Sequence, residues 1–197
     1  MVIKLLKPGG YIQPAVVIAA FLWLSDCKQS GHIDAKWLPA KPSATIVQLQ
    51  PMEGAPADIM AMLKDSLPRY YPISVQIAIP VALPANAYYK PRDRYKADSI
   101  LQYLQKIRAG NIRILAAVTA KDISARKGTI EDFGLMGYSY SPGYVCVVST
   151  YRLGKGNPSK QLFKQRLLKT IVHELGHNFG LPHCPNRHCI MAMQKAN

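Results

Sequence analysis

The sequence predicts one α/β domain that begins near Thr45. Three β-rich stretches alternate with two amphipathic helices over residues 45–119, and this order is typical of a largely parallel, right-handed α/β layer. The chain has 197 residues, of which 49% are hydrophobic, so one sizeable core can form. A long amphipathic helix near the C-terminus completes the expected domain.

Hydrophobic spacing, turn residues and prolines place the elements in order. Strands are predicted where β-rich runs occur, at residues 45–50, 73–79, 112–119, 134–140 and 143–150, the last two separated by Ser141-Pro142. Helices are predicted where apolar residues recur at helical spacing, at residues 57–67, 97–108 and 160–179. Pro68 ends the first helix, Gly110 is the expected C-cap of the second, and residues 80–91 are expected to form a loop.

The last predicted helix carries the motif HExxHxxGxxHC. Residues four apart share one face of a helix, so His173 and His177 can bind one metal ion together, with Glu174 beside it. Gly180 can adopt the positive φ that ends a helix, and the chain then brings His183 back as a third imidazole. The apolar stripe of this helix is offset from its histidines, so the histidines can face a cleft.

Three neutral imidazoles with a fourth position left for water are typical of a catalytic zinc site. We therefore expect one catalytic Zn²⁺ on His173, His177 and His183. Glu174 is the expected general base, which takes a proton from the attacking water and later passes it to the leaving amine. This chemistry predicts an enzyme that hydrolyses peptide bonds.

The chain is strongly basic, with 25 Lys and Arg against 11 Asp and Glu and a net charge of +14. Such a charge suits nucleic acids, anionic membranes or acidic substrates. The basic residues are scattered, with their densest run at residues 90–96, and no nucleic-acid motif accompanies them. We interpret the charge as a solvated surface, and expect a monomer that acts on a peptide or protein and binds no nucleic acid.

The N-terminus has the pattern of an export signal. Lys4 and Lys7 precede an apolar run at residues 14–24, which is too short to span a membrane. Cys27 follows, as the lipidated cysteine does in bacterial lipoprotein signals, although Asp26 stands where those signals have a small residue. Lipidation of Cys27, ordinary cleavage nearby and an uncleaved anchor are therefore left open.

These features divide the chain into three parts. Residues 1–27 are the expected export signal or lipoprotein-type leader, residues 28–44 a polar linker, and residues 45–197 the catalytic domain. We expect an exported protein, periplasmic or at the cell surface, that a lipidated Cys27 would tether to the membrane. A cytoplasmic protein is the alternative.

The motif and its continuation resemble the archaemetzincin (archaelysin) family of metzincin-type metallopeptidases, peptidase family M54. That family's signature continues HExxHxxGxxHC with four residues, a cysteine, one residue and a methionine, which here are Pro185-Asn186-Arg187-His188, Cys189, Ile190 and Met191. The resemblance also includes residues 92–98 and covers roughly residues 45–191. It implies a metzincin-like fold, in which a twisted, mostly parallel sheet with one antiparallel edge strand lies above the active-site helix.

The resemblance also assigns roles to three further residues. Met191 is the expected Met-turn, an apolar floor beneath the three histidines. In the family, four cysteines bind a second, structural zinc, but here only Cys184 and Cys189 match and no CxxC follows. A thiolate zinc site normally needs four ligands, so we expect no complete second site. A disulfide between the two cysteines and a second metal site that His188 assists are left open.

The expected edge strand, residues 134–140, also suggests where a substrate binds. An extended peptide could add to this strand by β-augmentation. Tyr138 or Tyr140 could assist the developing oxyanion, although an aromatic side chain that simply faces solvent is the alternative. The alternative function is a zinc-containing binding protein on the metzincin scaffold that hydrolyses nothing.

Overall fold

The computed structural model describes residues 45–193. Within this range there are three α-helices: α2 (Ala57–Ser66), α3 (Ala97–Ile107) and α4 (Lys160–Asn178). The strands of the same range are β1 (Ile46–Pro51), β2 (Ser74–Ile77), β3 (Tyr88–Tyr89), β4 (Arg94–Lys96), β5 (Ile114–Thr119), β6 (Ile123–Lys127), β7 (Ile130–Leu135), β8 (Gly137–Ser139) and β9 (Val145–Ser149). Short 3₁₀ helices occur at Leu67–Arg69, Ala85–Ala87 and Lys90–Arg92.

The main sheet has the strand order β2-β1-β5-β9-β8. All neighbouring strands are parallel except β8, which pairs antiparallel with β9 at the edge. The central strands β5 and β9 are buried along their whole length, as expected for parallel strands covered on both faces. The expectation of a mostly parallel sheet with one antiparallel edge strand is therefore confirmed.

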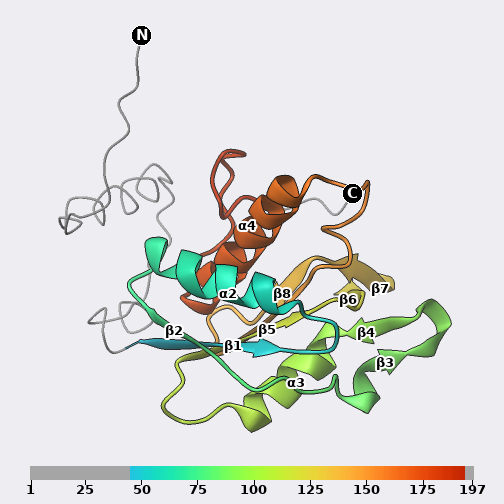
Figure 1. Cartoon of the computed structure of the whole chain (residues 1–197). Helices are drawn as coiled ribbons and strands as arrows, with labels where there is room; N and C mark the ends of the chain where they lie inside the picture. The colour runs from blue at the N-terminus through green and yellow to red at the C-terminus, as the bar shows by residue number, and fades with distance from the viewer. Residues whose placement is uncertain (1–44, 194–197) are drawn as a thin grey trace, which may run out of the picture.

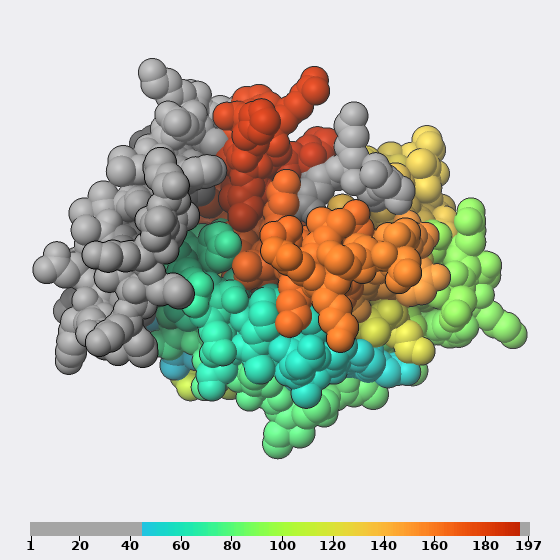
Figure 2. Space-filling model, turned by 45° about the horizontal axis from the view of Figure 1, so that its top comes forward, coloured from blue at the N-terminus to red at the C-terminus, as the bar shows by residue number. Residues whose placement is uncertain are grey.

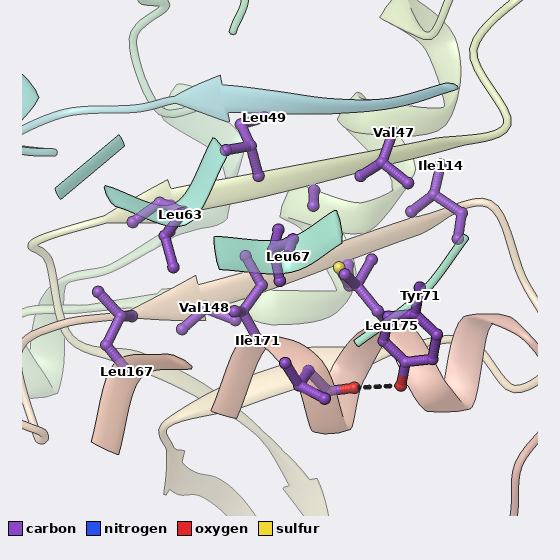
Figure 3. Packing of buried hydrophobic residues seen from close by; sticks show 14 of the residues in the cluster. Val47, Leu49, Leu63, Leu67, Tyr71, Ile114, Val148, Leu167, Ile171 and Leu175 are labelled. Atoms are coloured by element: carbon purple, nitrogen blue, oxygen red, sulfur yellow. Dashed lines mark hydrogen bonds between the residues drawn. The ribbon is translucent and has the colours of Figure 1, made fainter. Parts of the chain in front are cut away.

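Helices cover both faces of this sheet. Helices α2 and α4 lie on one face and α3 on the other (Figure 1), and a separate apolar cluster fills each interface. On α4 the side chains of Leu167, Ile171 and Leu175 are fully buried and point toward α2 and the sheet (Figure 3). The loop between β9 and α4 adds Leu153 to the same cluster and borders α2 on the surface (Figure 2).

A second sheet, with the order β3-β4-β6-β7, was absent from the sequence prediction. Its strands β3 and β4 have only two and three residues, too few for a periodic pattern. Residues 80–91, expected to form a loop, contain β3 and two 3₁₀ turns. The strand expected at residues 134–140 is divided, because Gly134 and Leu135 end β7 in the second sheet and β8 belongs to the first.

Two further boundaries differ from the prediction or lie beyond the structure. Helix α3 ends at Ile107 and its C-cap is Arg108, which has extended backbone angles, so Gly110 is not the C-cap. The predicted export signal and linker, residues 1–44, lie outside the described residues. Among the residues from 45 to 193, no helix combines the length and the apolar character needed to cross a bilayer.

A buried charge network joins the two sheets. The Asp122 carboxylate accepts hydrogen bonds from Arg152 Nε at 2.7 Å and Nη2 at 2.9 Å, and from Arg94 Nε at 2.8 Å. Arg94 also donates to the Asp132 carbonyl on β7 at 2.8 Å. A Cβ atom at Gly134 would lie 1.9 Å from the Arg152 guanidinium, so any larger residue there would have to displace this group from the network. The network therefore fixes the β6–β7 hairpin against the main sheet.

We predict that Asp122→Ala lowers the free energy of unfolding by about 3 kcal/mol, because it leaves two largely buried guanidinium groups without their carboxylate. Chemical denaturation monitored by circular dichroism measures this difference. The matched control is Glu53→Ala, which removes an ion pair to Lys121 whose side chains are 46% and 47% exposed. That change should cost less than about 1 kcal/mol. Equal losses in both variants would contradict the prediction.

Candidate metal centre

Three histidine side chains meet at one point beside α4. His173 and His177 come from the helix and His183 from the segment that follows it. The Nε2 atom of His177 lies 3.0 Å from Nε2 of His173 and 3.2 Å from Nε2 of His183. Nitrogens that bind one tetrahedral zinc at about 2.0–2.1 Å would be about 3.3–3.4 Å apart. The geometry therefore fits a zinc ion held by these three nitrogens.

Backbone carbonyls fix the orientation of two of these rings. Nδ1 of His173 lies 2.9 Å from the Ile190 carbonyl oxygen, and Nδ1 of His177 lies 2.8 Å from that of Leu181. An Nδ1–H group that donates to a carbonyl leaves the lone pair on Nε2, as second-shell partners of metal ligands do. Lone pairs that point at one another across about 3 Å repel, and a cation between them removes this repulsion.

Burial keeps these imidazoles neutral. It lowers the pKa of His173 to about 4, although the hydrogen bond to the Ile190 carbonyl acts to raise this pKa. Burial also lowers the pKa of His177 below its usual value. Metal ligands must be deprotonated, so both rings are available to bind a metal at neutral pH.

Gly180 ends the helix as expected, with a φ of 90°. Its amide donates to the His177 carbonyl at 2.8 Å, and the Leu181 amide donates to the Gly176 carbonyl at 2.9 Å. These two bonds form a Schellman motif, which reverses the chain direction. The chain then brings His183 back to the other two histidines.

Met191 packs against α4 at Gly176, next to the histidine His177 in the chain, where the helix has no side chain. A Cβ atom at Gly176 would lie 2.5 Å from the sulfur of Met191, so the glycine permits this close contact. On the same side, the Tyr71 hydroxyl donates to the Val172 carbonyl at 2.8 Å (Figure 3). Met191 is only 3% exposed. Its position fits the apolar floor that we expect, although its role as a Met-turn stays a prediction.

Cys184 and Cys189 lie in the same small cluster as Met191. Both side chains are buried, and the amide of Cys184 donates to the Met191 carbonyl at 2.9 Å. This main-chain hydrogen bond joins the two ends of the segment from Cys184 to Met191. The disulfide and the second metal site both stay predictions.

Glu174 is buried beside the histidines, with 7% of its surface exposed. Burial raises the pKa of its carboxyl group to about 7. A hydrogen bond acts in the opposite direction, because the Ser139 hydroxyl on β8 donates to Oε2 of Glu174 at 2.5 Å. The sequence analysis did not identify Ser139. The signal that could have found it is the alternation of the edge strand, which places residues 137 and 139 on one face.

A cleft of about 570 Å³ opens over this site. Its lining residues come from the β6–β7 hairpin, the edge strand β8, helix α4 and the C-terminal segment: Ala125, Arg126, Lys127, Phe133, Leu135, Met136, Gly137, Tyr138, Ser139, Ser141, His173, Glu174, His177, Pro182, His183 and Met193. The cleft is thus bordered by both sheets. The unpredicted second sheet supplies one of its walls.

The two edge-strand tyrosines differ in their relation to the cleft. Tyr138 lines it, but its ring also packs against the core cluster around α3, and burial and the nearby Asp98 raise the pKa of its hydroxyl. Tyr140 packs against the same cluster and is not among the described residues that line the cleft. Neither side chain simply faces solvent, and assistance to an oxyanion stays a prediction for both.

Comparison with known proteins places this site in a family. The sequence profile of peptidase family M54 matches residues 53–196. The chain belongs to peptidase family M54. An archaemetzincin from Haloarcula marismortui is 34% identical over 152 residues, which span 74% of this chain and 84% of that protein.

Solved structures agree with this membership. The crystal structure of the archaemetzincin from Methanopyrus kandleri superposes with a TM-score of 0.67 at 27% identity, over 80% of this chain and 85% of that one. The archaemetzincin from Archaeoglobus fulgidus, complexed with malonate, gives a TM-score of 0.65 at 26% identity, over 77% and 88% of the two chains. The fold and the family expected from the motif are therefore confirmed, and this M54 chain is a zinc metallopeptidase whose substrates are peptides or proteins.

We predict that zinc stabilises this M54 domain. With free zinc at about 100 times its dissociation constant, binding adds about 2.7 kcal/mol. For a domain of this size that free energy raises the melting temperature by about 5–10 °C. Differential scanning fluorimetry with zinc and with a chelator measures the shift. His183→Ala should bind zinc far more weakly and show little shift, and an unchanged shift in this variant would contradict the assignment of His183.

Proposed function

We propose that this peptidase hydrolyses peptide bonds with Glu174 as its general base, on a single zinc held by His173, His177 and His183. One observation carries the proposal. Three imidazole Nε2 atoms converge beside a buried carboxylate, and all four side chains line the same cleft. A convergent set of perturbed titratable groups in a cleft is typical of an active site.

The donor set suits zinc. It consists of three neutral nitrogens, which leave the full charge on the metal. When bound, zinc supplies a Lewis acid that polarises the scissile carbonyl and lowers the pKa of a water molecule to about 7.

Glu174 performs the proton transfers. Burial raises the pKa of its carboxyl group above the usual value for a glutamate, which makes it a better proton acceptor near neutral pH. It removes the proton from the attacking water, holds it on the carboxyl group, and gives it to the leaving amine nitrogen.

The substrate lies extended along β8. Among residues 45–193 this strand ends the main sheet and pairs only with β9, so its other edge can add a further strand. Its residues line the cleft next to the histidines. A peptide on this edge would pass the zinc with its backbone held by main-chain hydrogen bonds.

We propose one zinc per chain. Within residues 45–193, one group of three or more His, Cys, Asp or Glu residues has its donor atoms close enough together to hold a metal ion. That group is the three histidines. Inductively coupled plasma mass spectrometry on the purified protein should therefore give about one zinc per chain. A second equivalent of zinc that is lost in Cys184→Ser would contradict this stoichiometry and support a second site.

We predict that Glu174→Gln keeps the zinc and loses cleavage. A glutamine fills the same space but cannot accept the proton, and general bases contribute about 10²–10⁴-fold to rate. A peptide library with mass-spectrometric detection, together with the zinc content, measures both effects. Equal turnover in wild type and variant would contradict the mechanism. Cleavage by neither, with zinc retained and a bound partner recovered, would favour the non-hydrolytic binding protein.

A further inference from the structure

The edge strand β8 touches Glu174 through two residues on one of its faces. Ser139 donates its hydroxyl hydrogen to Oε2 of Glu174 at 2.5 Å. Two residues earlier, Gly137 faces the same side chain. Tyr138, between them, points to the opposite face, where it packs against the core cluster around α3.

Gly137 leaves no space between the strand and the carboxylate. A Cβ atom there would lie 2.5 Å from Oε1, 2.7 Å from Cγ and 2.9 Å from Cδ of Glu174. The glutamate side chain therefore lies flat against the strand at residue 137 and is hydrogen-bonded to it at residue 139. Any side chain larger than that of glycine would displace the carboxyl group.

The strand itself is held firmly against α4. Gly137 pairs with Val148 and Ser139 with Cys146, and both partners are fully buried in β9. Asn178, at the end of α4, donates from Nδ2 to the carbonyls of Tyr140 at 3.1 Å and Val145 at 2.9 Å. These bonds connect the β8–β9 turn to the helix that carries Glu174.

We propose that β8 holds the side chain of the general base in place. Ser139 and Gly137 are the positioning residues that orient the Glu174 carboxylate. Ser139 holds Oε2 by its hydrogen bond, and the backbone at Gly137 lies against Oε1. Glutamate has three side-chain torsions, and the contacts with β8 select one arrangement of them. The inference rests on the proposed role of Glu174 as the base.

This arrangement gives β8 two tasks at once. Its side-chain face orients the base, and its outer edge offers main-chain groups to the substrate. A peptide that pairs with β8 is thereby placed at a fixed position relative to the carboxylate, because both the peptide and the carboxylate are bound to the same strand. Errors of about 1 Å in such positioning can cost about 10²-fold in rate.

The first test removes the hydroxyl group of Ser139. Ser139→Ala should lower kcat by about 10- to 100-fold and leave KM within about twofold, with the zinc content unchanged. Ser139→Thr keeps a hydroxyl group and should recover kcat to within about threefold of wild type. The matched control is Ser99→Ala on α3, outside the cleft, which should leave kcat unchanged. A wild-type kcat in Ser139→Ala would overturn the proposal, as would a loss that threonine does not restore.

The second test displaces the Glu174 carboxylate while the Ser139 hydroxyl stays in place. In Gly137→Ala, the new methyl group meets the end of a flexible side chain, so the protein should fold with the carboxylate displaced. We expect kcat to fall by about 10-fold or more while the melting temperature stays within about 3 °C. A wild-type kcat in Gly137→Ala would count against the proposal.

A structural readout separates this inference from the proposed function. Crystal structures of zinc-loaded Ser139→Ala and Gly137→Ala should show the Glu174 carboxylate turned away from its position against β8, and an unmoved carboxylate overturns the inference whatever the activity. Full activity in Glu174→Gln would instead overturn the proposed role of the base. An inactive Glu174→Gln together with a fully active Ser139→Ala removes the positioning role alone.

Discussion

The site depends on the burial of one face of α4 against the main sheet. Leu167, Ile171 and Leu175 fill the interface with α2 and the sheet, and this fixes the rotation of the helix about its axis. His173 lies two residues beyond Ile171, about 200° around the helix, and so points away from the sheet. Glu174, one residue further, turns back toward β8. One packing constraint thus gives His173 and Glu174, the proposed ligand and the proposed base, their different surroundings.

Local rules explain why much of this could be predicted from the sequence. The periodicity of α4, the helix-ending Gly180 and the spacing of His173 and His177 each depend on residues that are near in the chain. The burial of β5 and β9 likewise follows from their apolar composition. The three histidines and the parallel core of the fold could be predicted because each depends on residues that lie close together in the sequence.

What the sequence did not reveal depends on contacts between distant segments. Ser139 and Glu174 are 35 residues apart, and only the register of β8 on β9 brings them together. The second sheet is built from strands as short as two residues, and the Asp122 network that fixes it joins three separate segments. Neither a short polar strand nor a long-range ion pair leaves a periodic pattern, so sequence periodicity alone cannot find them.

The carbonyl groups that orient the histidine rings belong to the main chain, at Leu181 and Ile190. Replacing either side chain therefore leaves the acceptor in place. The orientation of the ligands is encoded in the length and course of the segment between these two residues rather than in its side chains. Substitutions at Leu181 and Ile190 themselves therefore leave both acceptors in place, whereas inserting or deleting a residue between them would shift the two carbonyls relative to each other and turn the rings away from their common centre.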